Sequence, residues 1–222
     1  MRRTAPRRGS GSPGLSSGHV TGLPFPLTGA LAGQLASAAD VEGKLVRTLD
    51  ALGPLTGRDV LLLGEPGDPF AARLEDAGIP VRREPPTAPL RMDVPDASAD
   101  ALVSPWSGFR GVDPADIAEA DRVLRPGGRL LVVHDYGRDD VSRLGDADAP
   151  EYREWSRRGG PFLGSGAFRI RVVHCFWTFA SLDEVTGFLA EAFGDPGREV
   201  AAGLRRPRLS WNVAIYHRDR GA

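Results

Sequence analysis

An uninterrupted apolar run from Val60 to Leu63 is the feature that most constrains the fold of this chain. A strand with one solvent-facing side alternates apolar and polar residues. Four apolar residues in a row are instead typical of a strand covered on both faces, as in a parallel sheet. A turn sequence follows at 64–68, and 69–77 has apolar residues at helical spacing before Gly78 ends it. The stretch therefore predicts one strand–turn–helix unit of an α/β protein.

Further strands and helices alternate along the chain. Strands are expected at 79–83, 101–104 and 129–134, and helices at 29–52, 113–123 and after the capping-box sequence at 181–184. This alternation predicts a doubly wound, mostly parallel sheet. Near the C-terminus, Glu199–Leu204 and Leu209–Tyr216 are joined by "RRPR", and we expect them to form an antiparallel hairpin.

The chain divides into a tail and one domain. Its 222 residues suffice for a single α/β domain with a sizeable core. Residues 1–28 are rich in Arg, Ser, Gly and Pro, which predicts a disordered basic tail. The tail is either a solubilising extension or an arm that binds nucleic acid or another acidic partner. The domain is expected at 29–222, with an insertion or cap at 137–178 after the strand that ends near His134.

Composition excludes several classes of protein. The formal net charge is −1, which argues against nucleic-acid binding by the whole surface. No apolar run approaches the roughly 20 residues that a membrane helix needs. The single cysteine, Cys175, rules out an intrachain disulfide framework and favours a cytoplasmic location. The four histidines show no metal-ligand spacing, so we expect no metal site.

Three stretches of the sequence resemble a known family. They are "GRDVLLLGEPG", "MDVPDASADALVS" and "EADRVLRPGGRLLVVHDY". Together they resemble the class I S-adenosylmethionine-dependent methyltransferases, with a degenerate glycine-rich motif, over about residues 40–217. The resemblance implies a Rossmann-like fold with a sheet of the seven-stranded type and with S-adenosylmethionine bound in the crevice at the carboxyl ends of the first strands.

The glycine-rich loop departs from the family pattern of acid-x-Gly-x-Gly-x-Gly. Leu62 stands at the acid position and Gly64 at the first glycine, but Pro66 and Asp68 stand at the other two. Proline fixes φ and removes an amide donor. Asp68 places a carboxylate near the expected methionine end of the cofactor, unless it caps the helix that follows. Gly67, between the two, still allows close approach of a ligand.

The resemblance implies a set of cofactor-binding residues: Gly64, Glu65, Gly67, Glu84, Asp93 and Ser104. Glu84 matches the acid that binds the ribose hydroxyls, since a carboxylate suits a vicinal diol. Asp93 matches the acid at the adenine amino group, and Ser104 would lie beside the methyl group. Alternatively, Glu84 is a solvated glutamate paired with a neighbouring arginine, and Asp93 forms a turn before Pro95.

The segment "HDYGRDD", residues 134–140, supplies the candidate catalytic residues. His134 could act as a general base, because the ordinary pKa of histidine lies near neutrality. Tyr136 or Asp135 could orient an acceptor. In the alternative interpretation Asp135 and Tyr136 anchor the loop by hydrogen bonds.

Two main functions follow as hypotheses, beside a weaker third, a protein that associates with RNA or DNA through the arginine-rich tail. The first is an S-adenosylmethionine-dependent methyltransferase that acts on an unidentified acceptor, with a small molecule expected first. The alternative is a methyltransferase-fold protein that binds no cofactor and serves as a binding or regulatory subunit. Loop geometry discriminates between them. An open crevice lined by Gly64 and Gly67 favours the enzyme, and a loop filled by Pro66 or Asp68 favours the alternative.

Overall fold

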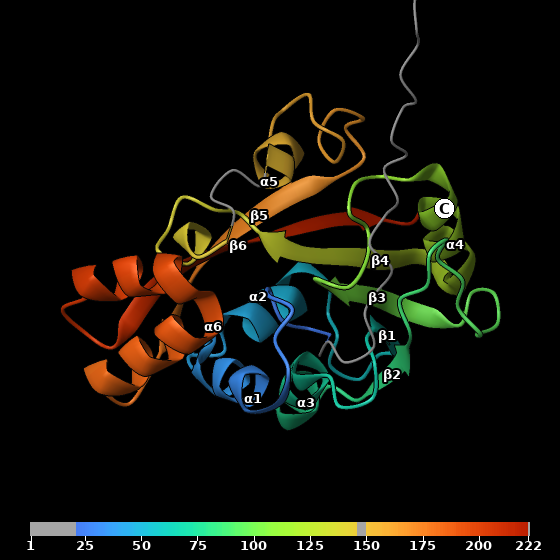
Figure 1. Ribbon diagram of the computed structural model, residues 1–222. Helices are drawn as coiled ribbons and strands as arrows, with labels where there is room; N and C mark the ends of the chain where they lie inside the picture. Colours follow the sequence, from blue (N-terminus) through green and yellow to red (C-terminus); the bar gives the residue numbers. More distant parts are fainter. Residues whose placement is uncertain (1–20, 146–149, 222) are drawn as a thin grey trace, which may run out of the picture.

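The computed structural model describes residues 21–145 and 150–221, and its centre is a single six-stranded sheet (Figure 1). The strands are β1 Val60–Leu63, β2 Val81–Glu84, β3 Ala99–Pro105, β4 Leu124–Asp135, β5 Arg169–Thr178 and β6 Arg208–Asp219. Their order across the sheet is β2-β1-β3-β4-β6-β5.

Neighbouring strands from β2 to β4 run parallel, and β6 runs antiparallel to both of its neighbours. The predicted α/β class is confirmed, with a mostly parallel sheet that closes on an antiparallel strand pair. The described residues form six strands, not seven. Residues 85–98 form no strand, because Pro85, Pro86 and Pro89 interrupt the backbone donors that a further strand would need.

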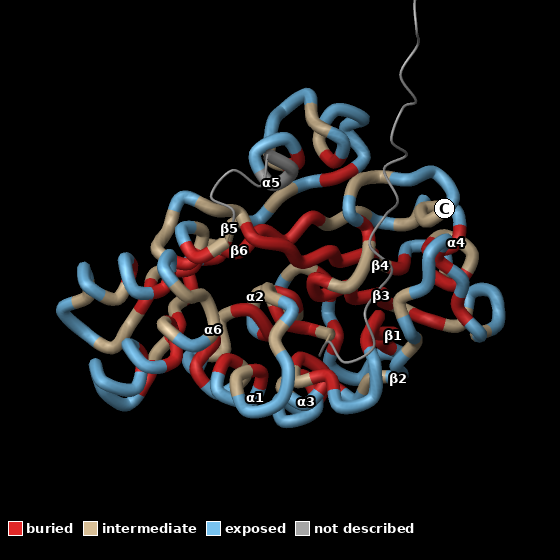
Figure 2. Tube along the Cα trace, in the orientation of Figure 1, coloured by how far each residue is buried: buried red, intermediate tan, exposed pale blue. Residues whose placement is uncertain are grey.

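Seven helical segments surround the sheet in the described chain: α1 Gly29–Ala38, α2 Lys44–Leu52, α3 Pro69–Asp76, α4 Pro114–Val123, the 3-10 turn η1 Val141–Arg143, α5 Pro150–Trp155 and α6 Leu182–Gly203. Figure 1 shows α1, α2 and α3 gathered on one side of the sheet. Leu62 faces a core with α1, α2, α3 and α6, whereas Leu61 faces a second core with α4 and with Phe162 of the 137–178 segment. The central strands β1 and β3 between these cores are almost wholly buried, whereas the edge strands β2 and β5 are partly exposed (Figure 2).

The predicted C-terminal hairpin was wrong in one of its two strands. Residues 199–203 belong to α6, and β6 pairs with β5 instead, with Val173 opposite Val213. From the sequence, Gly194 and Pro196 indicate an earlier end to this helix. In the structure Gly194 (φ 60°) kinks the helix, which then continues to Gly203 with Val200 buried.

The helix expected over 29–52 is two helices. Asp40 interrupts it, and its carboxylate accepts hydrogen bonds from the backbone N–H groups of Lys44 (3.0 Å) and Leu45 (2.8 Å) at the start of α2. Two backbone N–H groups at the start of α2 thereby gain an acceptor, which stabilises the interruption between α1 and α2.

Packing begins before residue 29. Residues 1–20 of the expected tail lie outside the described residues, but Leu23 is buried in the core. The ring of Phe25 contacts Trp177 at 5.8 Å and Phe193 at 4.9 Å. At the other end of the expected insertion, residues 169–178 form β5. None of the described helices combines the length and the apolarity that crossing a membrane requires.

Candidate functional site

The loop between β1 and α3 lies at the carboxyl edge of the parallel strands. Asp68 caps α3, because its Oδ1 accepts hydrogen bonds from the backbone N–H groups of Phe70 (2.8 Å) and Ala71 (3.2 Å). The capping interpretation is thus confirmed. Asp68 is only 3% exposed, and this burial raises the pKa of its carboxyl group above the ordinary value.

Residues Thr21–Leu27, which we call the N-terminal strap, begin on this loop, where Thr21 and Gly22 contact it. The Thr21 hydroxyl donates to Asp68 Oδ2 at 2.8 Å and accepts from the Glu65 backbone N–H at 2.9 Å. Gly22 follows with φ 74°, and a Cβ there would overlap the Asp68 carboxylate. Leu23 is then buried in the core. The strap therefore holds the loop through both hydrogen bonds and close packing.

Most of the backbone donors in the loop are engaged within the protein. The N–H of Gly64 donates to the Glu84 carbonyl at 2.9 Å, and that of Asp68 donates to the Glu65 carbonyl at 3.1 Å. A Cβ at Gly64 would lie 2.5 Å from Asp68 Oδ2, so the carboxylate fills the space beside this glycine. Gly67 has φ 86° and open space around it. Gly67 is thus the loop glycine that a ligand could reach without moving other groups.

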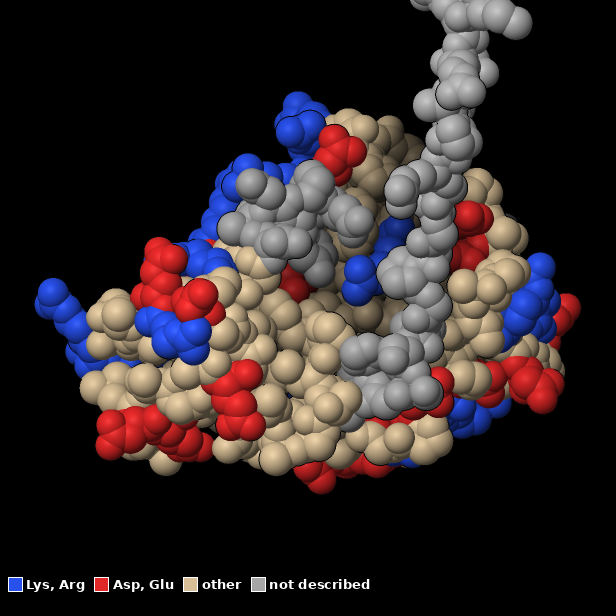
Figure 3. All heavy atoms as spheres, viewed as in Figure 1, with Lys and Arg blue, Asp and Glu red and all other residues tan. Residues whose placement is uncertain are grey.

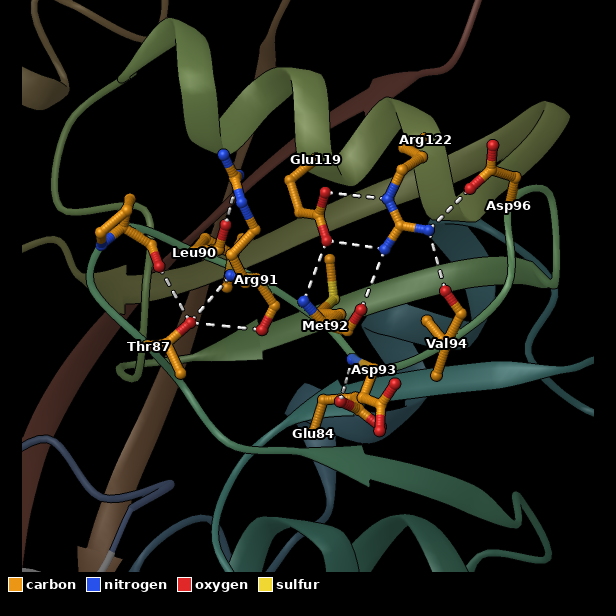
Figure 4. Close-up of polar contacts among 11 residues, drawn as sticks. Glu84, Thr87, Leu90, Arg91, Met92, Asp93, Val94, Asp96, Glu119 and Arg122 are labelled. Atoms are coloured by element: carbon orange, nitrogen blue, oxygen red, sulfur yellow. Dashed lines mark hydrogen bonds and ion pairs between the residues drawn. The ribbon is translucent and has the colours of Figure 1, made fainter.

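The two predicted acidic residues come together at the end of β2. Glu84 Oε2 accepts a hydrogen bond from the Asp93 backbone N–H at 2.9 Å (Figure 4). Glu84 pairs with neither adjacent arginine: Arg82 donates to the Ser98 carbonyl, and Arg83 pairs with Glu75. The Oε1 atom of Glu84 has no hydrogen-bond partner among the described residues.

A pair on α4 that the sequence analysis missed holds the segment around Asp93. Glu119 Oε1 accepts from the Met92 backbone N–H at 2.9 Å (Figure 4). Arg122 bonds Glu119 and donates to the carbonyls of Met92 (2.9 Å) and Val94 (2.8 Å). Hydrogen bonding from Arg122 lowers the pKa of Glu119 to about 2. The signal was present, because Glu and Arg three residues apart share one face of a helix.

Ser104 lies beneath the loop that follows β3. It is fully buried, and its Oγ has no hydrogen-bond partner among the described residues. A Cβ at Gly108 would lie 3.2 Å from Ser104 Oγ, so the loop backbone packs directly on it. Ser107 ties the same loop to β1 by donating to the Leu63 carbonyl at 2.6 Å.

His134 and Tyr136 occupy different environments at the end of β4. His134 is 1% exposed, and its ring centroid lies 4.7 Å from that of Trp155. Burial lowers the pKa of His134 to about 4, and Nε2 faces the Phe109 carbonyl at 3.2 Å. Tyr136 is half-buried, with the Arg138 guanidinium 5.7 Å from its ring centroid.

Asp135 points to the opposite face of the sheet from His134, which is the face that carries the strap. Its Oδ1 accepts a hydrogen bond from Trp211 Nε1 at 2.8 Å, and burial raises its pKa to about 7. The Trp211 ring stacks on Trp106 at 5.4 Å, and Phe70 packs edge-on to Trp106. These aromatic side chains and the strap enclose a cavity of only about 10 Å³.

The site fits S-adenosylmethionine at the Glu84 and Asp93 end but not at the Gly64–Asp68 loop. Glu84 and Asp93, which we call the acidic pair, are joined by the hydrogen bond from the Asp93 backbone N–H, and carboxylate oxygens suit hydroxyl and amino groups. The Gly64–Asp68 loop does not fit in this arrangement, because Thr21 engages the Glu65 amide and Asp68 fills the space at Gly64. No group of three or more His, Cys, Asp or Glu side chains in the described parts of the chain could hold a metal ion.

Charge is mixed around the site. On the face of the molecule shown in Figure 3, the Lys and Arg side chains of the described residues are interspersed with Asp and Glu. A surface that binds nucleic acid typically carries one continuous patch of basic side chains, which differs from this mixed pattern. The strap itself, "TGLPFPL", carries no charged residue.

Comparison with solved structures places this fold among known ones. A candidate type II methyltransferase from Anaeromyxobacter dehalogenans matches with a TM-score of 0.51 and 21% identity, over 81% of this chain and 96% of that one. A candidate methyltransferase from an antibiotic biosynthesis pathway of Anabaena variabilis matches with a TM-score of 0.51 and 12% identity, over 82% and 98%. No protein-family model and no curated protein matches the sequence. The chain has the class I methyltransferase fold.

Proposed function

We propose that this protein is an S-adenosylmethionine-dependent methyltransferase that acts on a small-molecule acceptor in the cytoplasm. The observation that carries the proposal is the hydrogen bond from the Asp93 backbone N–H to the Glu84 carboxylate, which joins the two acidic residues at the carboxyl edge of a class I methyltransferase fold. The Gly64 amide bonds the backbone of Glu84, so the acidic pair and the loop meet at one end of the sheet. Open α/β sheets bind their ligands at this edge.

Each residue would have a distinct role toward the cofactor. Glu84 would bind the ribose hydroxyls and Asp93 the adenine amino group, while backbone groups of Gly64, Glu65 and Gly67 would line the methionine end. Ser104 is buried under Gly108, so its proposed place beside the methyl group would require the loop after β3 to move. The cofactor supplies the reactive methyl group, and the protein supplies binding and orientation.

The acceptor side is assigned from the end of β4. Tyr136 lies half-buried at the edge and would orient the acceptor. His134 was the sequence-based candidate for the proton acceptor, but its burial against Trp155 and its lowered pKa argue for a packing role. Asp135 is also buried, but it lies on the face of the sheet that the strap covers, and we propose it as the proton acceptor in place of His134 once the strap has moved.

A second candidate function is favoured by one specific observation. Thr21 bonds both Glu65 and Asp68, which closes the loop against a cofactor. A protein fixed in this arrangement would keep the methyltransferase frame without its cofactor and would act as a binding or regulatory subunit.

Calorimetric titration with S-adenosylmethionine and S-adenosylhomocysteine separates the two functions. The proposed enzyme binds in the micromolar range, and Glu84→Gln weakens binding at least tenfold because the amide nitrogen cannot accept a hydroxyl hydrogen bond. Glu191→Gln is the matched control, since Glu191 is an exposed glutamate on α6. An absence of heat at millimolar ligand, together with no thermal stabilisation, would reject the enzyme and leave the second function.

A further inference from the structure

We propose that the N-terminal strap is an intramolecular competitor that occupies the loop's ligand-binding groups and must leave before a cofactor can bind. The inference rests on the proposed function and specifies how the same site is regulated. It predicts that strap and cofactor exclude each other, rather than that the strap closes over a bound cofactor.

The first argument is the use of loop hydrogen-bonding groups. Thr21 satisfies two partners with one hydroxyl: it accepts from the Glu65 N–H and donates to Asp68 Oδ2. Pro66 has no N–H, and the amides of Gly64 and Asp68 bond within the protein. The Glu65 amide is therefore a donor that a ligand could gain by displacing a single side chain.

The second argument is steric. Gly22 and Gly64 both approach the Asp68 carboxylate so closely that neither position has room for a Cβ. The strap backbone thus fills one side of the carboxylate and the loop backbone the other. A ligand group placed at Gly64 would need the space that Asp68 takes, and the Gly22 backbone packs against the same carboxylate.

The third argument is the limited attachment of the strap. Beyond Thr21 and Gly22, the strap packs on the core through the buried side chain of Leu23 and the partly buried side chains of Phe25 and Leu27, with the Phe25 ring against Trp177 and Phe193. The cavity between the strap and the aromatic side chains below is about 10 Å³. A short segment with few contacts opens at a small fraction of the global unfolding free energy, which suits a reversible cover.

The test uses the full chain and two measurements. Thr21→Val removes both hydrogen bonds while keeping the shape of the side chain, and Gly22→Ala forces a methyl group against Asp68. Thr28→Val is the matched control, because the Thr28 side chain makes no capping hydrogen bond. Hydrogen exchange of the 60–70 peptide measures strap release without ligand, and calorimetry measures the affinity for S-adenosylhomocysteine.

The proposal expects Thr21→Val and Gly22→Ala to speed exchange in the loop and to tighten S-adenosylhomocysteine binding at least tenfold, with Thr28→Val like the wild type. In the wild type, saturating ligand should speed exchange of residues 21–27, because two occupants of one site are reciprocally coupled. A strap that closes over the ligand would instead be protected by it, which overturns the proposal.

Three other outcomes also overturn the proposal and are distinguishable. If the loop is released but affinity equals that of the wild type, the strap is no competitor and the proposed function stands. If the loop is released and neither the variants nor the wild type bind ligand, the proposed function itself has failed. Unchanged loop exchange in both variants would show that the strap does not hold the loop.

Discussion

His134 and Asp135 are consecutive residues of β4, both buried, and their pKa values are shifted toward each other's usual range from opposite faces of the sheet. Burial lowers the pKa of His134 to about 4 and raises that of Asp135 to about 7. Burial disfavours the charged form of each group, so one mechanism has opposite effects on the pKa of a base and of an acid. Between about pH 4 and 7 both side chains are predominantly neutral, which is the condition that their burial requires.

Because the pKa of Asp135 is raised, we expect the free energy of unfolding to depend on pH. The pKa of Asp135 in the folded state, about 7, exceeds the ordinary value of 3.8. The contribution of this carboxyl group to the free energy of unfolding is therefore fully present below pH 3.8 and is lost as the pH rises to about 7. The difference corresponds to an effect on the order of 4 kcal/mol. Asp135→Asn keeps an acceptor for Trp211, and we expect it to match the wild type at pH 4 and exceed it at pH 8. Urea unfolding at both pH values measures this, and a constant difference would refute it.

For His134 we expect the opposite dependence of the free energy of unfolding on pH. Its folded pKa of about 4 lies below the ordinary 6.5, so stability is present above pH 6.5 and is lost as the pH falls toward 4. This contribution is on the order of 3 kcal/mol. His134→Gln retains a donor for the Phe109 carbonyl and should lose less stability than the wild type between pH 6.5 and 4. Denaturant midpoints across that range give the measurement, and parallel curves for both proteins would contradict it.

The sequence predicted the local features of this fold and missed those that depend on distant contacts. Val60–Leu63 forms β1, as expected for an apolar run that needs both faces covered. Asp68, followed by Pro69, caps α3, as expected for an aspartate before a proline at the start of a helix. The strap looked disordered by composition, but Leu23 and Phe25 bury against side chains that lie far away in sequence.

The candidate site shows the same limit. Glu84 and Asp93 were predictable because each follows an expected strand or precedes a turn, and the family resemblance gave them a role. The burial of Asp135 depends on Trp211, 76 residues away, and no local pattern indicates it. The pairing of β6 with β5 is equally long-range, and α6 could not be given its full length because Gly194 and Pro196 are ordinarily helix breakers.

The Glu119–Arg122 pair predicts an indirect effect on ligand binding. Glu119→Ala removes the acceptor of the Met92 N–H and a partner of Arg122, and we expect a loss of about 1–3 kcal/mol in unfolding free energy. The segment that carries Asp93 would loosen, so affinity for S-adenosylhomocysteine should also fall. Glu154→Ala is the control, because the exposed Glu154–Arg157 pair is worth about 0–1 kcal/mol. Lost stability with unchanged affinity would show that the pair does not position Asp93.

Asp68 and Asp113 offer a matched comparison of two helix caps. Each precedes a proline at the start of a helix, but Asp113 accepts one backbone hydrogen bond, whereas Asp68 accepts two and is also bonded by Thr21. Replacing a capping aspartate with alanine costs about 1 kcal/mol. We expect Asp113→Ala to show this cost and Asp68→Ala to exceed it by about 1 kcal/mol, because the Thr21 hydroxyl loses its acceptor. Equal losses in denaturant titrations would mean that the strap contributes nothing through this contact. A larger loss for Asp68→Ala that vanishes in the Thr21→Val background would assign the excess to the hydrogen bond between Thr21 and Asp68.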